Sequence, residues 1–149
     1  TDIQGAIAHN QFKRLDSLMR QRNQNRNIII KTLVSSKKWN NQFRFINIPN
    51  NFKPSWMGFP ILLSNRFRNK KKRFVNYLDS KGIETRPIIS GNFLNQPAAK
   101  LYKLNKEKRS YPNTQAVQEL GFLIGLHTKK IDEIKLKLIH DAFFKIDSI

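Results

Sequence analysis

GIETRPIISGNFLNQP, residues 82–97, predicts a strand that ends in a polar turn. The three isoleucines suit a half-buried strand over residues 83–89. Gly91 and Asn92 tolerate the positive φ of a sharp exit, which would leave the Asn92 amide free at the tip of the turn. Arg86 adds a planar guanidinium that suits a carboxylate or a phosphate. An ordinary β-turn beside a surface arginine, with no binding role, explains the same residues. A binding turn and an ordinary turn therefore both stay open at this point.

Hydrophobic periodicity outside this stretch predicts the remaining elements. Apolar residues recur every three or four positions from Thr1 to about Ser35, which predicts one long helix opened by a capping box at Thr1. Its polar middle, residues 20–27, would weaken the helix or mark a bend. Further helices are predicted over 68–80, 114–120 and 131–146, and further strands over 43–48, 57–63 and 122–126. The sequence therefore predicts an α+β fold, with a small, mainly antiparallel sheet packed against helices.

Composition limits both the size and the class of the chain. Its 149 residues leave room for one domain with a hydrophobic core. The absence of cysteine excludes disulfides and thiolate metal sites. No apolar run approaches the roughly 18 residues of a membrane-spanning helix. We therefore expect a soluble, cytoplasmic protein that does not cross a membrane.

The strong positive charge suggests one alternative function. Twenty-eight Lys and Arg against ten Asp and Glu give a net charge of +18, which would suit a basic nucleic-acid-binding module without catalytic activity. The densest run, residues 66–73, precedes apolar helical positions and is explained equally well by the exposed face of a helix. No RNA-binding or zinc-finger motif occurs, so no specific nucleic-acid partner is expected.

Four segments, in this order and spacing, resemble the C-terminal domain of the DegT/StrS family, whose members use pyridoxal phosphate to modify nucleotide-linked keto sugars. The segments are TDIQGAI with QFKRLD (1–7 and 11–16), SWMGFPI (55–61), the stretch 82–97, and GFLIGLH (121–127). The Gly-Asn-Phe turn resembles the corresponding turn in one branch of this family. That branch contains the 4-keto-6-deoxyhexose 3-dehydrases and their aminotransferase relatives. Residues 8–10, Ala-His-Asn, depart from the family's pattern.

This resemblance implies that residues 1–149 form the single C-terminal small domain of a larger enzyme, whose N-terminal cofactor-binding domain lies outside this chain. The implied substrate is a nucleotide-linked 4-keto-6-deoxyhexose used for surface polysaccharide such as lipopolysaccharide. The implied cofactor is pyridoxal or pyridoxamine 5'-phosphate, bound mainly by the missing domain of a homodimer. Amino transfer and 3-dehydration stay open, because the Lys or His that decides between them would lie before residue 1. The chain alone is therefore expected to hold no catalytic nucleophile and to be inactive.

Within the family the small domain closes over the substrate, and the resemblance implies five contact residues here. Arg86 would supply charge, Asn92 an amide, and Gly91 room for a close backbone approach. Ser55 and Trp56 would add a hydroxyl and an aromatic wall, although Trp56 also suits an ordinary core position.

The histidines give a weaker signal. His127 ends an apolar strand, so it would stand behind the residues that touch a ligand. His9 and His140 fall in helical patterns, and no pair of histidines has metal-ligand spacing. No metal site is expected.

Overall fold

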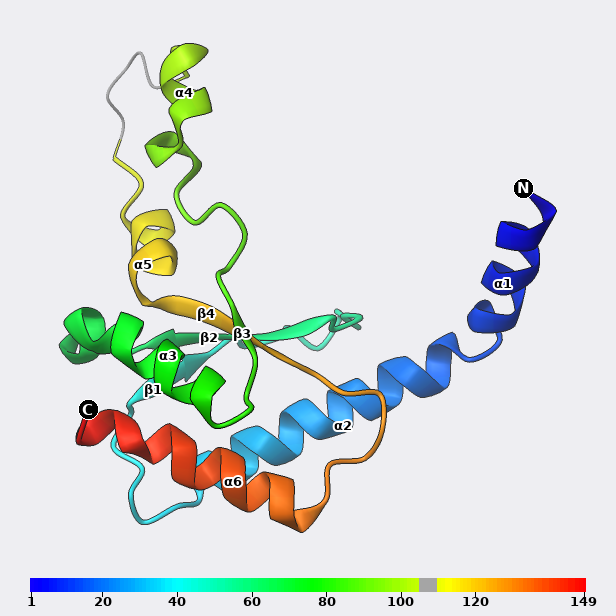
Figure 1. Cartoon of the computed structure of the whole chain (residues 1–149), viewed down its shortest axis with the longest axis horizontal. Coiled ribbons are helices and arrows are strands. Elements are labelled where there is room, and N and C mark those ends of the chain that lie inside the picture. Colours follow the sequence, from blue (N-terminus) through cyan, green and yellow to red (C-terminus); the bar gives the residue numbers. More distant parts are fainter. Residues whose placement is uncertain (105–109) are drawn as a thin grey trace.

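The structure is a computed structural model that describes residues 1–104 and 110–149. One antiparallel sheet with the strand order β1-β2-β4-β3 forms its centre (Figure 1). The strands are β1 (Phe43–Phe45), β2 (Gly58–Leu63), β3 (Thr85–Arg86) and β4 (Gly121–Gly125). The predicted α+β fold with a small antiparallel sheet is confirmed.

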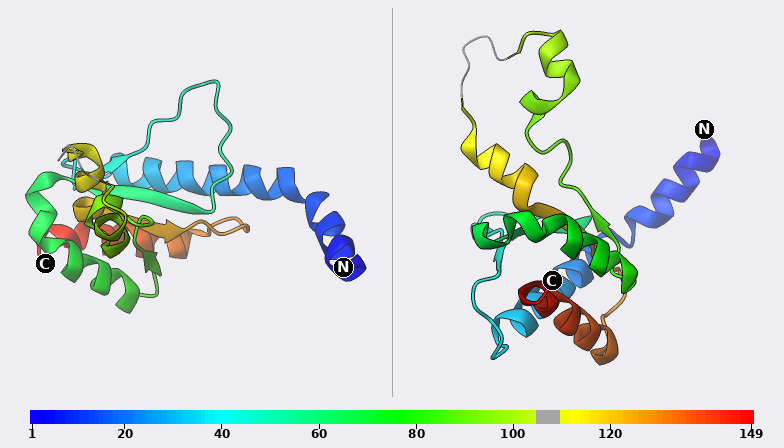
Figure 2. Two further views of the ribbon diagram at one scale, coloured as in Figure 1. Left: turned by 90° about the horizontal axis from the view of Figure 1, so that it is seen from above. Right: turned by 60° about the vertical axis from the view of Figure 1, so that its left-hand side comes forward.

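Helices cover one face of this sheet and extend from its ends (Figures 1 and 2). The α-helices are α1 (Asp2–Phe12), α2 (Leu15–Val34), α3 (Lys71–Ser80), α4 (Pro97–Leu101), α5 (Pro112–Leu120) and α6 (Glu133–Phe143). Short 3-10 helices are η1 (Asn65–Lys70), η2 (Phe93–Asn95) and η3 (Phe144–Asp147). Helices α2, α3 and α6 supply the apolar side chains that meet the sheet.

The core is built around four buried phenylalanines from different elements. Phe43 lies 5.1 Å from Phe143 between ring centroids. Phe74 meets both Phe122 and Phe143 edge-on, at 5.9 Å in each case. Edge-to-face pairs of this kind add about 0.5–1.5 kcal/mol each beyond the burial of their area. They join β1, β4, α3 and α6 into one body.

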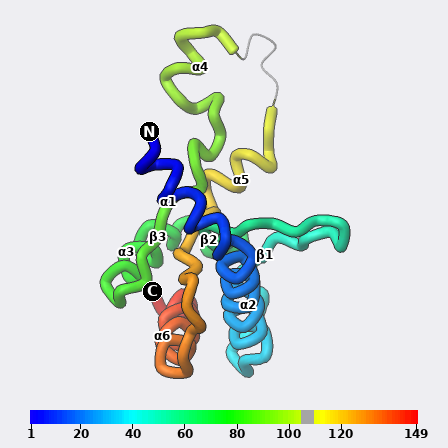
Figure 3. The backbone as a smooth tube through the Cα atoms, turned by 90° about the vertical axis from the view of Figure 1, so that its right-hand side faces the viewer, coloured from blue at the N-terminus to red at the C-terminus, as the bar shows by residue number. Residues whose placement is uncertain are grey.

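The N-terminal helical region differs from the sequence prediction. It is two helices, because the chain breaks at Lys13 and Arg14, and α1 turns away from the body with no buried residue (Figure 3). The bend predicted within residues 20–27 is wrong, since α2 is continuous there. Asn25 donates from Nδ2 to the carbonyls of His127 and Lys129, at 2.7 and 2.8 Å. Long-range partners thus satisfy Asn25, the buried amide of this polar middle. The capping box at Thr1 is confirmed.

The strand predicted over 83–89 is reduced to two residues. Thr85 and Arg86 pair with Ile124 and Leu123 of β4. Pro87 follows at once, and a residue without an N–H cannot extend the ladder. Ile89 is 78 % exposed, so it does not face the core.

The other predicted elements are present with shifted ends. The helix predicted from residue 68 begins as η1, becomes α3 at Lys71, and is followed by Gly82 with φ +77. The last helix begins at Glu133 after an Asp132 cap. Among the described residues, no helix is long and apolar enough to span a membrane.

Candidate functional site: a polar turn on helix α5

The turn after β3 packs directly on α5. Ser90 and Gly91 both have positive φ, 59° and 53°, and the Gly91 N–H donates to the Ile88 carbonyl at 3.1 Å. A Cβ placed on Gly91 would lie 2.7 Å from Cβ of Gln118. Gly91 therefore permits a close approach, and what approaches it is the helix.

Asn92 is buried, and its amide is not free at the tip of the turn as the sequence predicted. Nδ2 donates to Oε1 of Gln115 at 3.0 Å, and Oδ1 accepts the N–H of Leu94 at 3.2 Å. The Asn92 backbone N–H donates to Oε1 of Gln118 at 2.9 Å. The correction has a local cause, since an Asn before a short helix caps it with its own side chain.

A wider network holds the turn in place. Asn95 donates from Nδ2 to the same two glutamine oxygens, at 2.9 Å to Gln115 and 3.1 Å to Gln118. Gln115 in turn donates from Nε2 to Oε1 of Glu119 at 2.8 Å. Nη1 of Arg68 lies 2.6 Å from Oε2 of Glu119. The network thus joins the turn and α5 to η1.

A cavity of about 500 Å³ opens beside this network. It is lined by Arg68, Asn92, Leu94, Asn95, Ser110, Tyr111, Pro112, Gln115, Ala116 and Glu119. Amide, carboxylate, guanidinium and phenol groups around one space offer many hydrogen-bond donors and acceptors, which suits a polyhydroxylated ligand. The sequence analysis did not predict that helix α5 contributes side chains to this lining. The signal was present in QAVQE, because Gln115, Gln118 and Glu119 recur at helical spacing.

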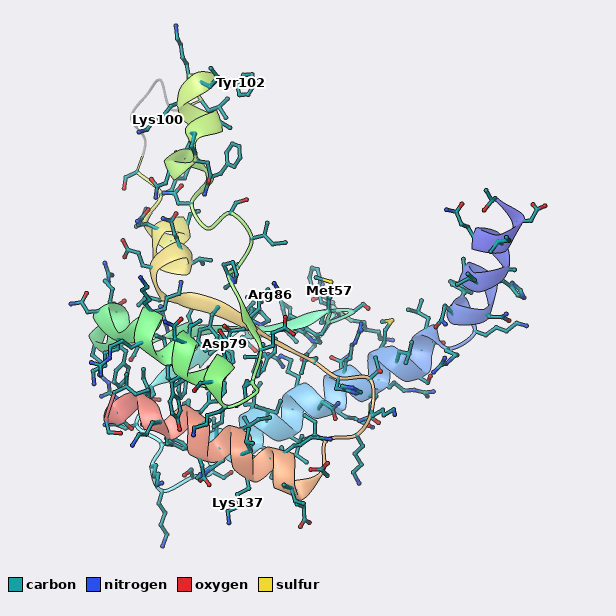
Figure 4. All side chains as sticks on the ribbon, viewed as in Figure 1. Met57, Asp79, Arg86, Lys100, Tyr102 and Lys137 are labelled. Atoms are coloured by element: carbon teal, nitrogen blue, oxygen red, sulfur yellow. The ribbon has the colours of Figure 1, made fainter. Side chains whose placement is uncertain are left out.

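Arg86 lies apart from this cavity, on the short strand β3 (Figure 4). Its guanidinium forms an ion pair with Glu84, and the two side chains are 73 % and 72 % exposed. Exposed pairs of this kind contribute about 0–1 kcal/mol. Asp79 is engaged elsewhere, since its carboxylate accepts the Thr85 N–H at 2.7 Å. Breaking the pair with Glu84 therefore costs little free energy, so the Arg86 guanidinium is available to a ligand anion.

Ser55 and Trp56 lie in the loop between β1 and β2. The Ser55 side chain is exposed, whereas Trp56 is partly buried and lies 4.9 Å from the Arg26 guanidinium. His127 follows β4, where its Nδ1 accepts the Lys129 N–H at 2.9 Å. It lines a separate, mainly apolar cavity of about 550 Å³.

The structure thus brings Gly91 and Asn92 together but leaves the other predicted contact residues in separate surroundings. Within residues 1–104 and 110–149, no hydrogen bond joins Arg86, Trp56 or His127 to the turn, and none of the three lines the cavity beside it. The same residues contain no cluster of three or more acidic, His or Cys side chains that could hold a metal ion.

Comparison with known proteins places these features in a family. The chain is 28% identical over 157 aligned residues to the lipopolysaccharide biosynthesis protein RfbH of Salmonella typhimurium, covering 99% of this chain and 33% of that protein. The chain therefore spans about a third of the length of this relative.

Two solved structures share the fold. Escherichia coli GDP-4-keto-6-deoxy-D-mannose-3-dehydratase with bound hydrated PLP matches with a TM-score of 0.71 at 22% identity, covering 93% of this chain and 34% of the other. Spr1654 of Streptococcus pneumoniae, in its apo form, matches with a TM-score of 0.80 at 17% identity, over 99% of this chain and 35% of the other. The family model that matches residues 1–141 extends from α1 into α6, and so includes the polar turn, α5 and the whole sheet. The chain belongs to the DegT/DnrJ/EryC1/StrS aminotransferase family.

Proposed function

We propose that this chain is the C-terminal domain of an enzyme that uses pyridoxal or pyridoxamine 5'-phosphate to modify a nucleotide-linked 4-keto-6-deoxyhexose for surface polysaccharide. The observation that carries the proposal is the family match over residues 1–141, nearly the whole chain. The likeness to RfbH and to the fold of the Escherichia coli 3-dehydratase supports this substrate class. Amino transfer and 3-dehydration are both compatible with the residues of this chain.

The cofactor's covalent anchor is proposed to lie outside this chain. A lysine that forms a Schiff base needs a desolvated, unoccupied amine. Among the described lysines, Lys71 is the one whose pKa is clearly lowered by burial, but its Nζ donates to the Gln118 carbonyl at 2.7 Å. Lys71 therefore does not fit this role. When bound by the rest of the enzyme, the cofactor would supply the electron sink for the reaction.

The residues of this chain would then bind and orient the substrate. Arg86 would contact a phosphate of the nucleotide through its exposed guanidinium, at the cost of a weak surface pair. Gly91 and Asn92 would hold the turn against α5, so that the backbone of the turn and the adjoining cavity meet sugar hydroxyls. Ser55 and Trp56 would contact the substrate from the β1–β2 loop.

His127 and helix α1 complete the proposal. His127 would stand behind the residues that touch the ligand. Ile3 and Phe12 of α1 are each 74 % exposed, and Ile7 is 60 % exposed, which supports packing of α1 on the rest of the enzyme. We propose a cytoplasmic homodimer.

Two preparations test this function: the complete gene product and the 149-residue chain. The complete protein should show the visible absorbance of bound pyridoxal phosphate and consume GDP-4-keto-6-deoxymannose, with an amino sugar or a 3-deoxy sugar as the product. The 149-residue chain should do neither. A stoichiometric Schiff base on any lysine of the 149-residue chain would overturn the domain assignment, and a complete protein that binds no cofactor would overturn the function.

A further inference from the structure

A serine, a histidine and an aspartate meet where the C-terminal ends of α2 and α6 lie side by side (Figure 1). Nε2 of His140 lies 2.9 Å from Oγ of Ser36, and Nδ1 of the same ring lies 2.9 Å from Oδ1 of Asp141. Ser36 comes two residues after the end of α2, whereas His140 and Asp141 belong to α6. Packing of the two helices therefore brings together Ser36 and His140, which are 104 positions apart in sequence.

The carboxylate decides which nitrogen of the imidazole carries the proton. The hydrogen bond from His140 holds the pKa of Asp141 below its usual value, with smaller contributions from the charges of Lys137 and Lys38, so Asp141 is ionised at neutral pH. An ionised carboxylate only accepts hydrogen bonds, so Nδ1 of His140 is the donor. In the neutral imidazole Nε2 is then an acceptor, and its partner is the O–H of Ser36.

This arrangement is the one that activates a serine as a nucleophile. A base within about 2.6–3.2 Å of the hydroxyl takes its proton, and a third group orients the base. His140 meets this condition toward Ser36, and Asp141 orients it. The ring of Phe144 also meets the imidazole edge-on, with 4.9 Å between the two centroids. The imidazole is therefore held on three sides with Nε2 toward the hydroxyl.

Backbone N–H groups lie beside the same hydroxyl. The Lys38 N–H donates to Oγ of Ser36 at 3.2 Å, and a bond of this kind stabilises the oxygen as it loses its proton. The N–H of Lys37, the residue after Ser36, forms no hydrogen bond with the described residues. In α/β-hydrolases the N–H that follows the nucleophile helps to stabilise the oxyanion of the substrate. Lys37 thus supplies a free donor at the corresponding position.

The three side chains are accessible from solvent. Ser36 and His140 are half-buried, and Asp141 is exposed. Neither Ser36 nor His140 lines the cavity beside the polar turn or the apolar cavity next to His127. A substrate would therefore react at an open surface, where little binding energy is gained. This restricts the substrate to a small ester whose alcohol is a good leaving group.

We propose that Ser36 is a nucleophile that accepts acyl groups from small activated esters, with His140 as its general base and Asp141 as a positioning residue. Oγ of Ser36 bonds to the carbonyl carbon while Nε2 of His140 takes the hydroxyl proton. The bond between that carbon and the alcohol oxygen then breaks, and the alcohol leaves with the proton from His140. Water attacks the acyl-serine in the same way, which releases the acid and restores Ser36. This activity does not depend on the function proposed above.

A fluorophosphonate tests the nucleophile directly, because an activated serine displaces its fluoride and keeps the phosphonyl group. The 149-residue chain should gain one phosphonyl group, and peptide mass spectrometry should locate it on Ser36. Ser36→Ala and His140→Gln should abolish this labelling. Ser35→Ala removes the neighbouring, exposed hydroxyl and should label like the unchanged chain. Absence of labelling at Ser36 in the unchanged chain, or undiminished labelling of Ser36 in His140→Gln, would overturn the proposal.

Hydrolysis of p-nitrophenyl acetate tests the roles of the other two residues. The rate of p-nitrophenol release should rise with pH as the imidazole loses its proton, and His140→Gln should remove this rise. Asp141→Asn should lower the rate about tenfold or more and move the midpoint of the rise to lower pH, because the carboxylate that favours the charged imidazolium is gone. A merely structural role of Asp141 would lower the rate without moving the midpoint.

His9→Gln is the control for catalysis by any exposed imidazole, since His9 lies on α1 away from Ser36. It should leave the rate within about twofold of the unchanged chain, because His9 has no contact with the serine. Circular dichroism shows that each compared variant is folded. Equal losses in His9→Gln and His140→Gln, or an unchanged rate in Ser36→Ala, would overturn the proposal.

Discussion

Asn92 donates from Nδ2 to Oε1 of Gln115 across 3.0 Å, and this bond joins the turn after β3 to helix α5. The two residues are 23 positions apart in sequence, so the shape of the turn depends on a helix that the chain forms later. The same Asn92 side chain caps η2 through the Leu94 N–H. Asn92 is thus a structural residue of the turn, whatever the turn binds.

Asn92→Ala should destabilise the 149-residue chain by about 1–3 kcal/mol, because buried partners lose their hydrogen bonds. Urea unfolding followed by circular dichroism measures this difference. Asn51→Ala, at an exposed position of the β1–β2 loop, is the matched control and should stay within about 0.5 kcal/mol of the unchanged chain. Equal unfolding midpoints for the two variants would show that the network on α5 does not hold the turn.

Gly91→Ala should be more damaging than Gly82→Ala. Both glycines have positive φ, so both substitutions carry a backbone strain of about 1–2 kcal/mol. A Cβ on Gly82 meets nothing within 4 Å, whereas one on Gly91 collides with Gln118. Urea midpoints for the two variants measure the extra cost of the collision. If the two variants are equally stable, α5 does not constrain the turn.

Arg86→Ala should separate binding from folding in the complete enzyme. We expect kcat/KM to fall about tenfold or more, as for the loss of one contact to an anion. The melting temperature should hardly change, because the Arg86–Glu84 pair is exposed. Glu84→Ala is the control, since it breaks the same pair without removing the cation. Unchanged kinetics in Arg86→Ala would remove Arg86 from the substrate site.

Acid should weaken the start of α6. The Lys135 N–H donates to Asp132 Oδ1 at 2.8 Å, and this bond and the Lys135 ammonium hold the pKa of Asp132 below its usual value. The stabilisation is therefore complete above an unfolded-state pKa of about 3.9 and is lost as the pH falls through the lower folded-state value.

Asp132→Asn keeps a capping side chain but cannot titrate. The difference in urea midpoint between Asp132→Asn and the unchanged chain should shrink as the pH falls from 5 to 2. A difference that stays constant over this range would contradict the assignment.

Nucleic-acid binding should be weak and blind to sequence. If the charge of +18 reflects composition and not a built interface, affinity for DNA or RNA should be largely lost by about 200 mM salt, because binding of this kind depends on counterion release. Fluorescence anisotropy with unrelated oligonucleotides at rising salt tests this. Tight, sequence-selective binding that survives at 200 mM salt would instead support the nucleic-acid-binding module.

The local sequence pattern was sufficient to predict those elements whose hydrophobic residues are also the residues buried in the core. The apolar run of β2 and the amphipathic helix α6 were predicted nearly to their ends because their apolar side chains meet the core. The polar stretch of α2 failed as a prediction, since its buried Asn25 is satisfied by carbonyls about 100 positions away. No local pattern carries that information.

Long-range partners also limited the prediction of the candidate site. Gly91 and Asn92 were predicted as a turn from their residue types, and the turn is present. Its partners Gln115 and Gln118 could not be deduced, because their contact depends on how α5 packs on the chain before it. Sequence therefore predicted the turn and the positive φ of Gly91, but the second positive φ lies at Ser90 and not at Asn92, whose φ is −86°. The surroundings of the turn were not predicted.

The shortness of β3 has a consequence for self-association. An edge strand exposes unpaired N–H and C=O groups that can template pairing with another chain. Here the ladder with β4 involves only Thr85 and Arg86, and Pro87 follows. The outer edge of the sheet therefore offers a second molecule too few donors for strand addition, and the exposed Arg86 adds a charge that repels an identical edge. This side of the sheet is protected against edge-to-edge aggregation.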